Sequence, residues 1–232
     1  LVGHSSENGQ GGYTYRYAAN FASNAAAVAA FERALLRWQC DKQTNLLASQ
    51  QGQPAPCSNQ DGVNVVSFDA GCDIGSSTLG RTYQYYRGCQ QFPLGPLEWH
   101  LLEWDIVFAA SPPNAQWNFA RQAPTPAQSD FESVALHELG HVLLLNHVNL
   151  NRAVMNARLT RGDRVISLSA SEDQGYDRVR SVTATGPFCG SSAYQDLNTA
   201  ALPCNTLSRS NFAQHQQPPW RLAPLGTGPA QT

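Results

Sequence analysis

The sequence predicts an α+β domain, and two observations support this class. Segments with strand-like patterns fill much of the first 110 residues, and one long helical segment, residues 22–39, interrupts them. Two further helical segments follow, at residues 129–143 and 169–181, separated by turns rich in Asn and Arg. This mixture of strands and helices is typical of the α+β class.

The first helical segment, residues 22–39, carries the clearest periodic pattern in the N-terminal half. Its apolar side chains recur at helical spacing, and Asn24 or Ser23 can cap its start. Strands are predicted on either side of it, from alternating or continuous apolar runs. They are residues 13–18, 46–48, 63–69, 82–89 and 97–109.

Capping signals mark the two later helices. Ser129 is followed three residues later by Glu132, which fits a capping box at the start of the helix 129–143. Ser169 and Glu172 repeat this pattern at the start of the helix 169–181. The helix 129–143 has an apolar face made of Phe131, Val134, Ala135, Leu139 and Val142.

Residues 137–147, HELGHVLLLNH, contain the pattern around which the chain is organised. His137 and His141 are four residues apart, so on a helix they share one face and can bind one metal ion. His147 follows six residues later, and the chain must bend after His141 to bring it back. Three imidazole ligands with one open position describe a catalytic zinc site. Glu138 lies where a general base for a zinc-activated water belongs.

The chain's single methionine adds a second coincidence. Met155 follows His147 by eight residues, in the segment NRAVMNA. The pattern HExxHxxxxxH followed by a methionine turn resembles the metzincin metallopeptidases. The eight-residue interval and the segment DFESVALHELGH, residues 130–141, resemble the matrixin branch of that family.

This resemblance covers roughly residues 13–181 and implies a fold and an activity. The implied fold is a twisted mixed sheet with two main helices above an active-site cleft, and a smaller irregular lower lobe with the methionine turn and a C-terminal helix. The catalytic domain would span residues 1–182, with the upper lobe ending near residue 143. The implied activity is peptide-bond hydrolysis with one zinc ion, and Met155 would lie under that ion and support the histidines.

The resemblance also implies the substrate-binding residues. The strand 105–110, DIVFAA, would border the cleft as an edge strand and pair with an extended peptide. Its candidate residues are Ile106, Val107, Phe108 and Ala109. The pocket for the residue after the scissile bond would be walled by Ala157, Arg158 and Leu159. Ser133 and Val134 would face the same pocket, which a small side chain at Ser133 makes deep.

The chain departs from the metzincin pattern at two places. Metzincins usually have glycine three residues after the second histidine, where the chain turns, and here that residue is Leu144. A leucine in the left-handed conformation costs about 1–2 kcal/mol, and Asn146 is an alternative site for the turn. Matrixins also carry a pair of aspartates that anchor the mature N-terminus, and the matching residues here are Ser171 and Glu172.

Composition bounds the remaining expectations. The formal net charge is −2 and there is no long run of like charges, so nucleic-acid binding has no electrostatic support. No segment approaches the roughly 20 apolar residues of a membrane span. The chain starts at Leu1 without a signal-like segment, which suggests a mature or trimmed form. A calcium ion would find carboxylates at Asp61, Asp69 and Asp73, but no loop has a recognised calcium spacing, so turn aspartates are preferred.

Six cysteines at wide spacing predict disulfides and an oxidising compartment, and therefore a secreted protein. Six cysteines allow 15 pairings. Locality favours Cys40–Cys57 and Cys72–Cys89, and Cys189–Cys204 would staple a C-terminal extension, residues 183–232, that ends in a tail. The alternative is six free buried thiols in a cytosolic protein.

The function that accounts for these observations is a secreted, monomeric zinc endopeptidase acting on proteins or peptides. Its alternative is a zinc-binding, metzincin-like module with lost or very narrow catalytic activity. A blander alternative, in which the histidines only pack, must treat the histidine spacing and the lone methionine as accidents.

Overall fold

The central sheet confirms the predicted α+β class. The computed structural model describes residues 11–49, 54–57, 59–90, 97–182 and 194–207. Their main sheet has five strands in the order β2-β1-β3-β5-β4. All neighbouring strands are parallel except β4, which is antiparallel to β5. The strands are β1 (Tyr13–Tyr17), β2 (Leu46–Ala48), β3 (Asn64–Phe68), β4 (Gly80–Gln90) and β5 (Leu97–Phe108).

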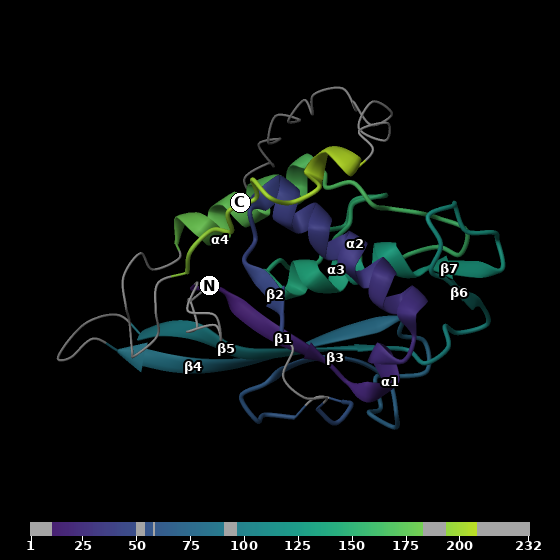
Figure 1. Cartoon of the computed structure of the whole chain (residues 1–232), viewed down its shortest axis with the longest axis horizontal. Helices are drawn as coiled ribbons and strands as arrows, with labels where there is room; N and C mark the ends of the chain where they lie inside the picture. The colour runs from purple at the N-terminus through teal and green to yellow at the C-terminus, as the bar shows by residue number, and fades with distance from the viewer. Residues whose placement is uncertain (1–10, 50–53, 58, 91–96, 183–193, 208–232) are drawn as a thin grey trace, which may run out of the picture.

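Two long helices lie next to one another on one side of this sheet, as Figure 1 shows. They are α2 (Ala25–Lys42), which follows the short α1 (Ala19–Ala22), and α3 (Phe131–Val142), which carries the first two histidines. A small parallel pair, β6 (Gln116–Asn118) and β7 (Gln128–Asp130), leads into α3. From Leu143 to Ser169 the chain has no helix or strand, as expected for an irregular lower lobe; α4 (Ala170–Ser181) and a 3-10 turn, η1 (Cys204–Thr206), follow.

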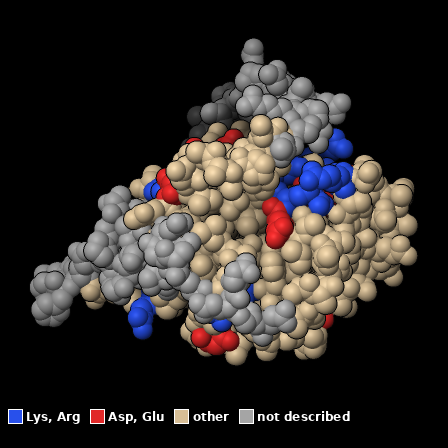
Figure 2. All heavy atoms as spheres, viewed as in Figure 1, with Lys and Arg blue, Asp and Glu red and all other residues tan. Residues whose placement is uncertain are grey.

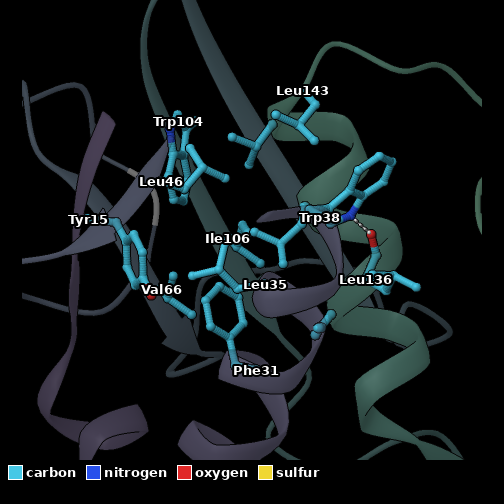
Figure 3. Packing of buried hydrophobic residues seen from close by; sticks show 14 of the residues in the cluster. Tyr15, Phe31, Leu35, Trp38, Leu46, Val66, Trp104, Ile106, Leu136 and Leu143 are labelled. Atoms are coloured by element: carbon cyan, nitrogen blue, oxygen red, sulfur yellow. Dashed lines mark hydrogen bonds between the residues drawn. The ribbon is translucent and has the colours of Figure 1, made fainter. Parts of the chain in front are cut away.

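The core joins the sheet to both long helices. Apolar side chains of α2, α3, β1, β3 and β5 form one buried cluster, part of which is shown in Figure 3. Trp38 of α2 lies fully buried in it and donates its indole N–H to the main-chain oxygen of Leu136, at 3.0 Å. This bond fixes α2 against the turn of α3 that precedes the first histidine.

The start of α3 differs from the prediction by one residue. The N-cap is Asp130, whose carboxylate accepts the main-chain N–H of Ser133, so the predicted capping box at Ser129 and Glu132 is wrong. Glu132 is instead 1% exposed and pairs with three guanidinium groups. A buried carboxylate is costly unless it is paired with opposite charge, so these ion pairs take the place of the capping contact. The three partners are Arg33 and Arg37 of α2 and Arg164 of the lower lobe.

The N-caps of α2 and α4 are formed by residues that the sequence predicted. Asn24 caps α2 by accepting the main-chain N–H of Ala27. Ser169 and Glu172 form the complete capping box of α4.

The position of the strand 105–110 was predicted incorrectly. Residues Asp105–Phe108 of β5 pair with β3 on one side and with β4 on the other, so they are central in the sheet. The last strand of the sheet on this side is β4. Ile106, Val107 and Phe108 therefore have no main-chain edge to offer a peptide, and their side chains are fully buried.

All three predicted disulfide pairings are wrong. Cys40 of α2 bonds Cys204, and Cys57 bonds Cys72. Cys89 is also disulfide-bonded, whereas Cys189 lies outside the described residues. Locality failed for Cys40 and Cys204 because the fold returns the C-terminal segment to α2 after 164 residues. The bridge therefore holds that segment against α2 instead of closing a small appendage.

The segment 194–207 packs on the domain that precedes it. The Tyr194 hydroxyl accepts the main-chain N–H of Asn45, and Asp196 pairs with Arg180 of α4. On the face shown in Figure 2, one large group of basic side chains stands out, other charged side chains are scattered, and most of the described surface is uncharged. None of the helices in the described ranges has the length and apolar character needed to cross a membrane.

Candidate metal centre

The three histidines meet at one point, although they come from two different segments. His137 and His141 project from successive turns of α3, and His147 comes from the chain that follows the helix. Their Nε2 atoms lie 3.1 Å (His141 to His137), 3.1 Å (His141 to His147) and 3.2 Å (His137 to His147) apart. They are the one group of three or more potential ligands among the described residues.

A reversal of the chain at Leu144 brings His147 back to the helix. Leu144 has φ of 65°, in the left-handed region, so leucine makes the turn that glycine usually makes. The main-chain N–H groups of Leu144 and Leu145 donate to His141 and Gly140, which closes the end of α3. Asn146 is not among the residues with positive φ, so the turn does not move there.

The hydrogen bonds of the imidazole rings show what the site is built to hold. Nδ1 of His137 lies 2.7 Å from the Val154 carbonyl, and Nδ1 of His141 lies 2.8 Å from the Leu145 carbonyl. A carbonyl only accepts, so both Nδ1 atoms carry the proton, and both Nε2 atoms present lone pairs. Burial lowers the pKa of His137 to about 4 and also lowers that of His141, which keeps both rings neutral.

A zinc ion fits this donor set. Lone pairs converging at 3.1–3.2 Å repel each other unless a cation lies between them. Ligands at about 2.0–2.1 Å from a tetrahedral zinc ion are about 3.3 Å apart, close to the observed separations. Neutral imidazoles oriented by carbonyl acceptors are also the usual zinc ligands.

Met155 packs directly beneath the helix that carries the first two histidines. It is 1% exposed, and a Cβ atom placed on Gly140 would lie 2.3 Å from its Sδ atom. Its main-chain N–H donates to Glu172 of α4, and its carbonyl accepts the N–H of Val148. The family resemblance aligned Glu172 with an aspartate that anchors the mature N-terminus. Residues 1–10 lie outside the described residues, and the contact that Glu172 makes here is to the methionine turn.

Glu138 is the buried carboxylate of the site. It is 4% exposed, and burial raises its pKa to about 7, although a hydrogen bond from Thr82 and the charge of Arg81 oppose this. The Thr82 hydroxyl lies 2.7 Å from Glu138 Oε2 and 3.1 Å from its main-chain oxygen. This hydroxyl therefore has an acceptor whether or not Oε2 carries a proton.

The strand β4 thus contributes side chains to the site that the sequence did not single out. Besides Thr82, Gln84 donates its side-chain amide to the main-chain oxygen of His141. Nothing in the segment GRTYQYYRG marks these two residues, because their partners lie more than 50 positions later in the chain.

The residues predicted to form the substrate pocket lie in different surroundings. Ser133 and Val134 are buried, and the Ser133 hydroxyl donates to Asp130 and accepts the N–H of Val165. Ala157 and Arg158 are exposed, whereas Leu159 packs against the core. Ala109 is buried just beyond the end of β5. Their roles toward a substrate remain predictions.

Two of the three aspartates weighed for calcium, Asp61 and Asp69, have local partners. Asp61 accepts the main-chain N–H of Val63, and Asp69 accepts those of Gly71 and Cys72. These contacts are typical of aspartates that stabilise turns, so no calcium site is proposed.

Comparisons with known proteins agree with this geometry. A family model described as matrixin matches residues 12–179, which include the whole sheet, α3 and the three histidines. A curated protein of Arabidopsis thaliana, metalloendoproteinase 5-MMP, is 34% identical over 71 residues. That match covers 31% of this chain and 20% of the plant protein, so the chain spans only a fifth of the length of that relative.

Proposed function

This chain belongs to the matrixin family of zinc metallopeptidases, and from this premise we propose that it is an endopeptidase that hydrolyses peptide bonds with Glu138 as general base. One observation carries the proposal. Three imidazole nitrogens, two from α3 and one from the chain after it, converge at zinc-ligand spacing, and α3 also holds a buried glutamate next to the first histidine. A structural zinc site needs no such carboxylate, and it normally has a fourth protein ligand.

The chemistry divides between the metal and the chain. His137, His141 and His147 would hold the zinc ion, which when bound would supply a Lewis acid for the reacting oxygen atoms. Glu138 takes a proton from the water that attacks the peptide carbonyl and later donates it to the leaving amine.

The outer edge of β4 is the surface that suits a substrate backbone. This strand is last in the sheet order, and its residues Thr82 and Gln84 contact the helix of the histidines. An extended peptide can add to such an edge through main-chain hydrogen bonds. In this proposal β4 replaces residues 106–109 as the strand that holds the substrate, and Ala157, Arg158 and Leu159 remain candidates for the pocket wall.

Disulfides and family membership support secretion. Two bridges, Cys40–Cys204 and Cys57–Cys72, are complete among the described residues, and such bridges persist in oxidising compartments. We propose that the enzyme acts outside the cell, as a monomer, on unfolded or flexible proteins.

The first test is cleavage of an unfolded protein such as casein, with and without a zinc chelator. We expect cutting that the chelator stops and that added zinc restores. Glu138→Gln should abolish cutting while one zinc per chain stays bound, and Glu32→Gln, at an exposed glutamate of α2, serves as the control.

Each other outcome has a defined meaning. Zinc binding without cutting by the parent protein would favour the non-catalytic module. Normal cutting by Glu138→Gln would exclude Glu138 as the base.

A further inference from the structure

We propose that Thr82 is a positioning residue for Glu138, and that its hydroxyl holds Oε2 so that Oε1 is the oxygen that exchanges the proton. This inference rests on the proposed peptidase function. It concerns an edge-strand side chain that neither the histidine pattern nor the family match singles out.

The first support is the contact itself. The Thr82 hydroxyl lies 2.7 Å from Glu138 Oε2, across 56 positions of sequence. A hydrogen bond from a neutral donor to a carboxylate is stronger than one between neutral groups, and Glu138 is nearly excluded from water. Losing this bond would leave one buried oxygen without its donor and the carboxylate freer to rotate.

The second support is that Thr82 is itself held in place from both sides. Its main chain pairs with Ile106 of β5 in the antiparallel ladder. Two residues further along, Gln84 is attached to α3 through the main-chain oxygen of His141. The donor therefore belongs to a rigid element, which a positioning role requires.

The third support is the contrast between the two carboxylate oxygens. Oε2 faces the Thr82 hydroxyl, whereas Oε1 faces Gly80, where an added Cβ atom would lie only 2.9 Å away. A residue with a side chain at position 80 would crowd Oε1. On β4, Thr82 thus binds one carboxylate oxygen, and the lack of a side chain at Gly80 leaves room beside the other.

The variant Thr82→Val tests the proposal, because valine keeps the β-branched shape that suits a strand and replaces the hydroxyl with a methyl group that cannot donate a hydrogen bond. Thr82→Ser keeps the hydroxyl. Thr14→Val, at a half-buried threonine of β1, is the matched control. All are made in the full chain loaded with zinc, and kcat, KM, zinc content and melting temperature are measured with a casein-derived peptide.

We expect Thr82→Val to lower kcat by about 10- to 100-fold, the order of loss that follows misplacement of a catalytic group. KM and zinc content should stay unchanged, and Thr82→Ser should stay within about three-fold of the parent, as serine keeps the donor. A crystal structure of the zinc-loaded Thr82→Val protein should show the Glu138 carboxylate rotated or in two orientations. The Thr82→Ser protein should show the parent orientation.

The contrary results are equally distinct. Unchanged kcat in Thr82→Val, or equal losses in the valine and serine variants, would overturn the proposal while leaving the peptidase function intact. An unchanged carboxylate orientation in Thr82→Val would also overturn it. A parent protein that binds zinc and cuts nothing would overturn the proposed function, and this inference with it.

Discussion

Gly140 lies between the two helical histidines, and replacing it with alanine should destabilise the domain and weaken zinc binding by displacing Met155. A Cβ atom at position 140 would lie 2.3 Å from Met155 Sδ, 3.2 Å from Met155 Cε and 3.4 Å from Cζ2 of Trp38. Carbon and sulfur need more than 3.5 Å, so the methionine would have to move by over 1 Å. Met155 is 1% exposed, in a packed core, and has little room to do so.

Two opposing effects set the size of the change. Alanine within a helix is favoured over glycine by about 1 kcal/mol, which would stabilise the variant. Overpacking a core costs about 1–3 kcal/mol, and this close approach belongs at the upper end of that range. The difference is a net loss of about 2 kcal/mol, which for a domain of this size lowers the melting temperature by about 4–8 °C.

Gly175 of α4 provides the matched control, because it is also a helical glycine. There an added Cβ atom would meet only Cδ2 of Leu145, at 3.1 Å, which is the end of a flexible side chain. We expect Gly175→Ala to change stability little or to raise it, and to leave zinc affinity unchanged.

Calorimetry and zinc titration of both variants measure the two effects. Since Met155 packs against the helix of the histidines, Gly140→Ala should also weaken zinc binding. If Gly140→Ala were as stable as the parent and bound zinc equally well, the proposed support of the histidines by Met155 would be refuted.

Four further predictions concern two buried carboxylates, the zinc site and one disulfide. Glu132→Ala should cost about 3–5 kcal/mol in denaturant unfolding at pH 7, because it leaves three arginines without their buried partner, and Glu32→Ala should cost little. Burial raises the pKa of Glu132, but the Arg33 hydrogen bond and the arginine charges lower it overall, so this contribution should disappear as pH falls through the depressed folded pKa. Asp105 behaves oppositely: burial raises its pKa from 3.8 to about 7, so its contribution is complete below pH 3.8 and is lost as pH rises from 3.8 through 7, and the stability loss over that range should be smaller in Asp105→Asn. Zinc at about 1,000 times its dissociation constant should stabilise the apoprotein by about 4 kcal/mol, measured as a melting shift that a chelator reverses; no shift would contradict the metal site. Replacing both Cys40 and Cys204 by alanine should cost about 2–5 kcal/mol, measured against the parent without reductant.

The sequence alone determined the features that depend on neighbours along the chain. The spacing of His137 and His141 follows from helix geometry, and the observed Nε2 separation agrees with it. The caps at Ser169 and at Asn24, which was one of the two cap residues predicted for the helix 22–39, are formed by side chains that bond main-chain groups two or three residues away. The cost of placing Leu144 in a left-handed turn was also foreseeable, since φ at that point depends on the local chain reversal.

The wrong sheet position for residues 105–110 had a sequence signal that pointed the other way. The run Ile106-Val107-Phe108 is apolar on both faces, which is typical of a central strand in a parallel sheet. The polar pattern of residues 80–90 is more typical of an edge. The family resemblance suggested only that a strand borders the cleft. The pattern of apolar and polar residues would have favoured residues 80–90 over residues 105–110 for that position.

Only the tertiary structure decided the contacts between residues far apart in the sequence, in the fold and at the site. The bridge from Cys40 to Cys204, the arginines around Glu132 and the Thr82 hydroxyl on Glu138 join residues between 32 and 164 positions apart. Their residue types are common, and no local pattern distinguishes the threonine that contacts the proposed general base from a threonine that faces solvent. The packing of β4 against α3 makes that distinction. It buries the Glu138 carboxylate away from water, and it places the Thr82 hydroxyl where it can donate the hydrogen bond that water would otherwise provide.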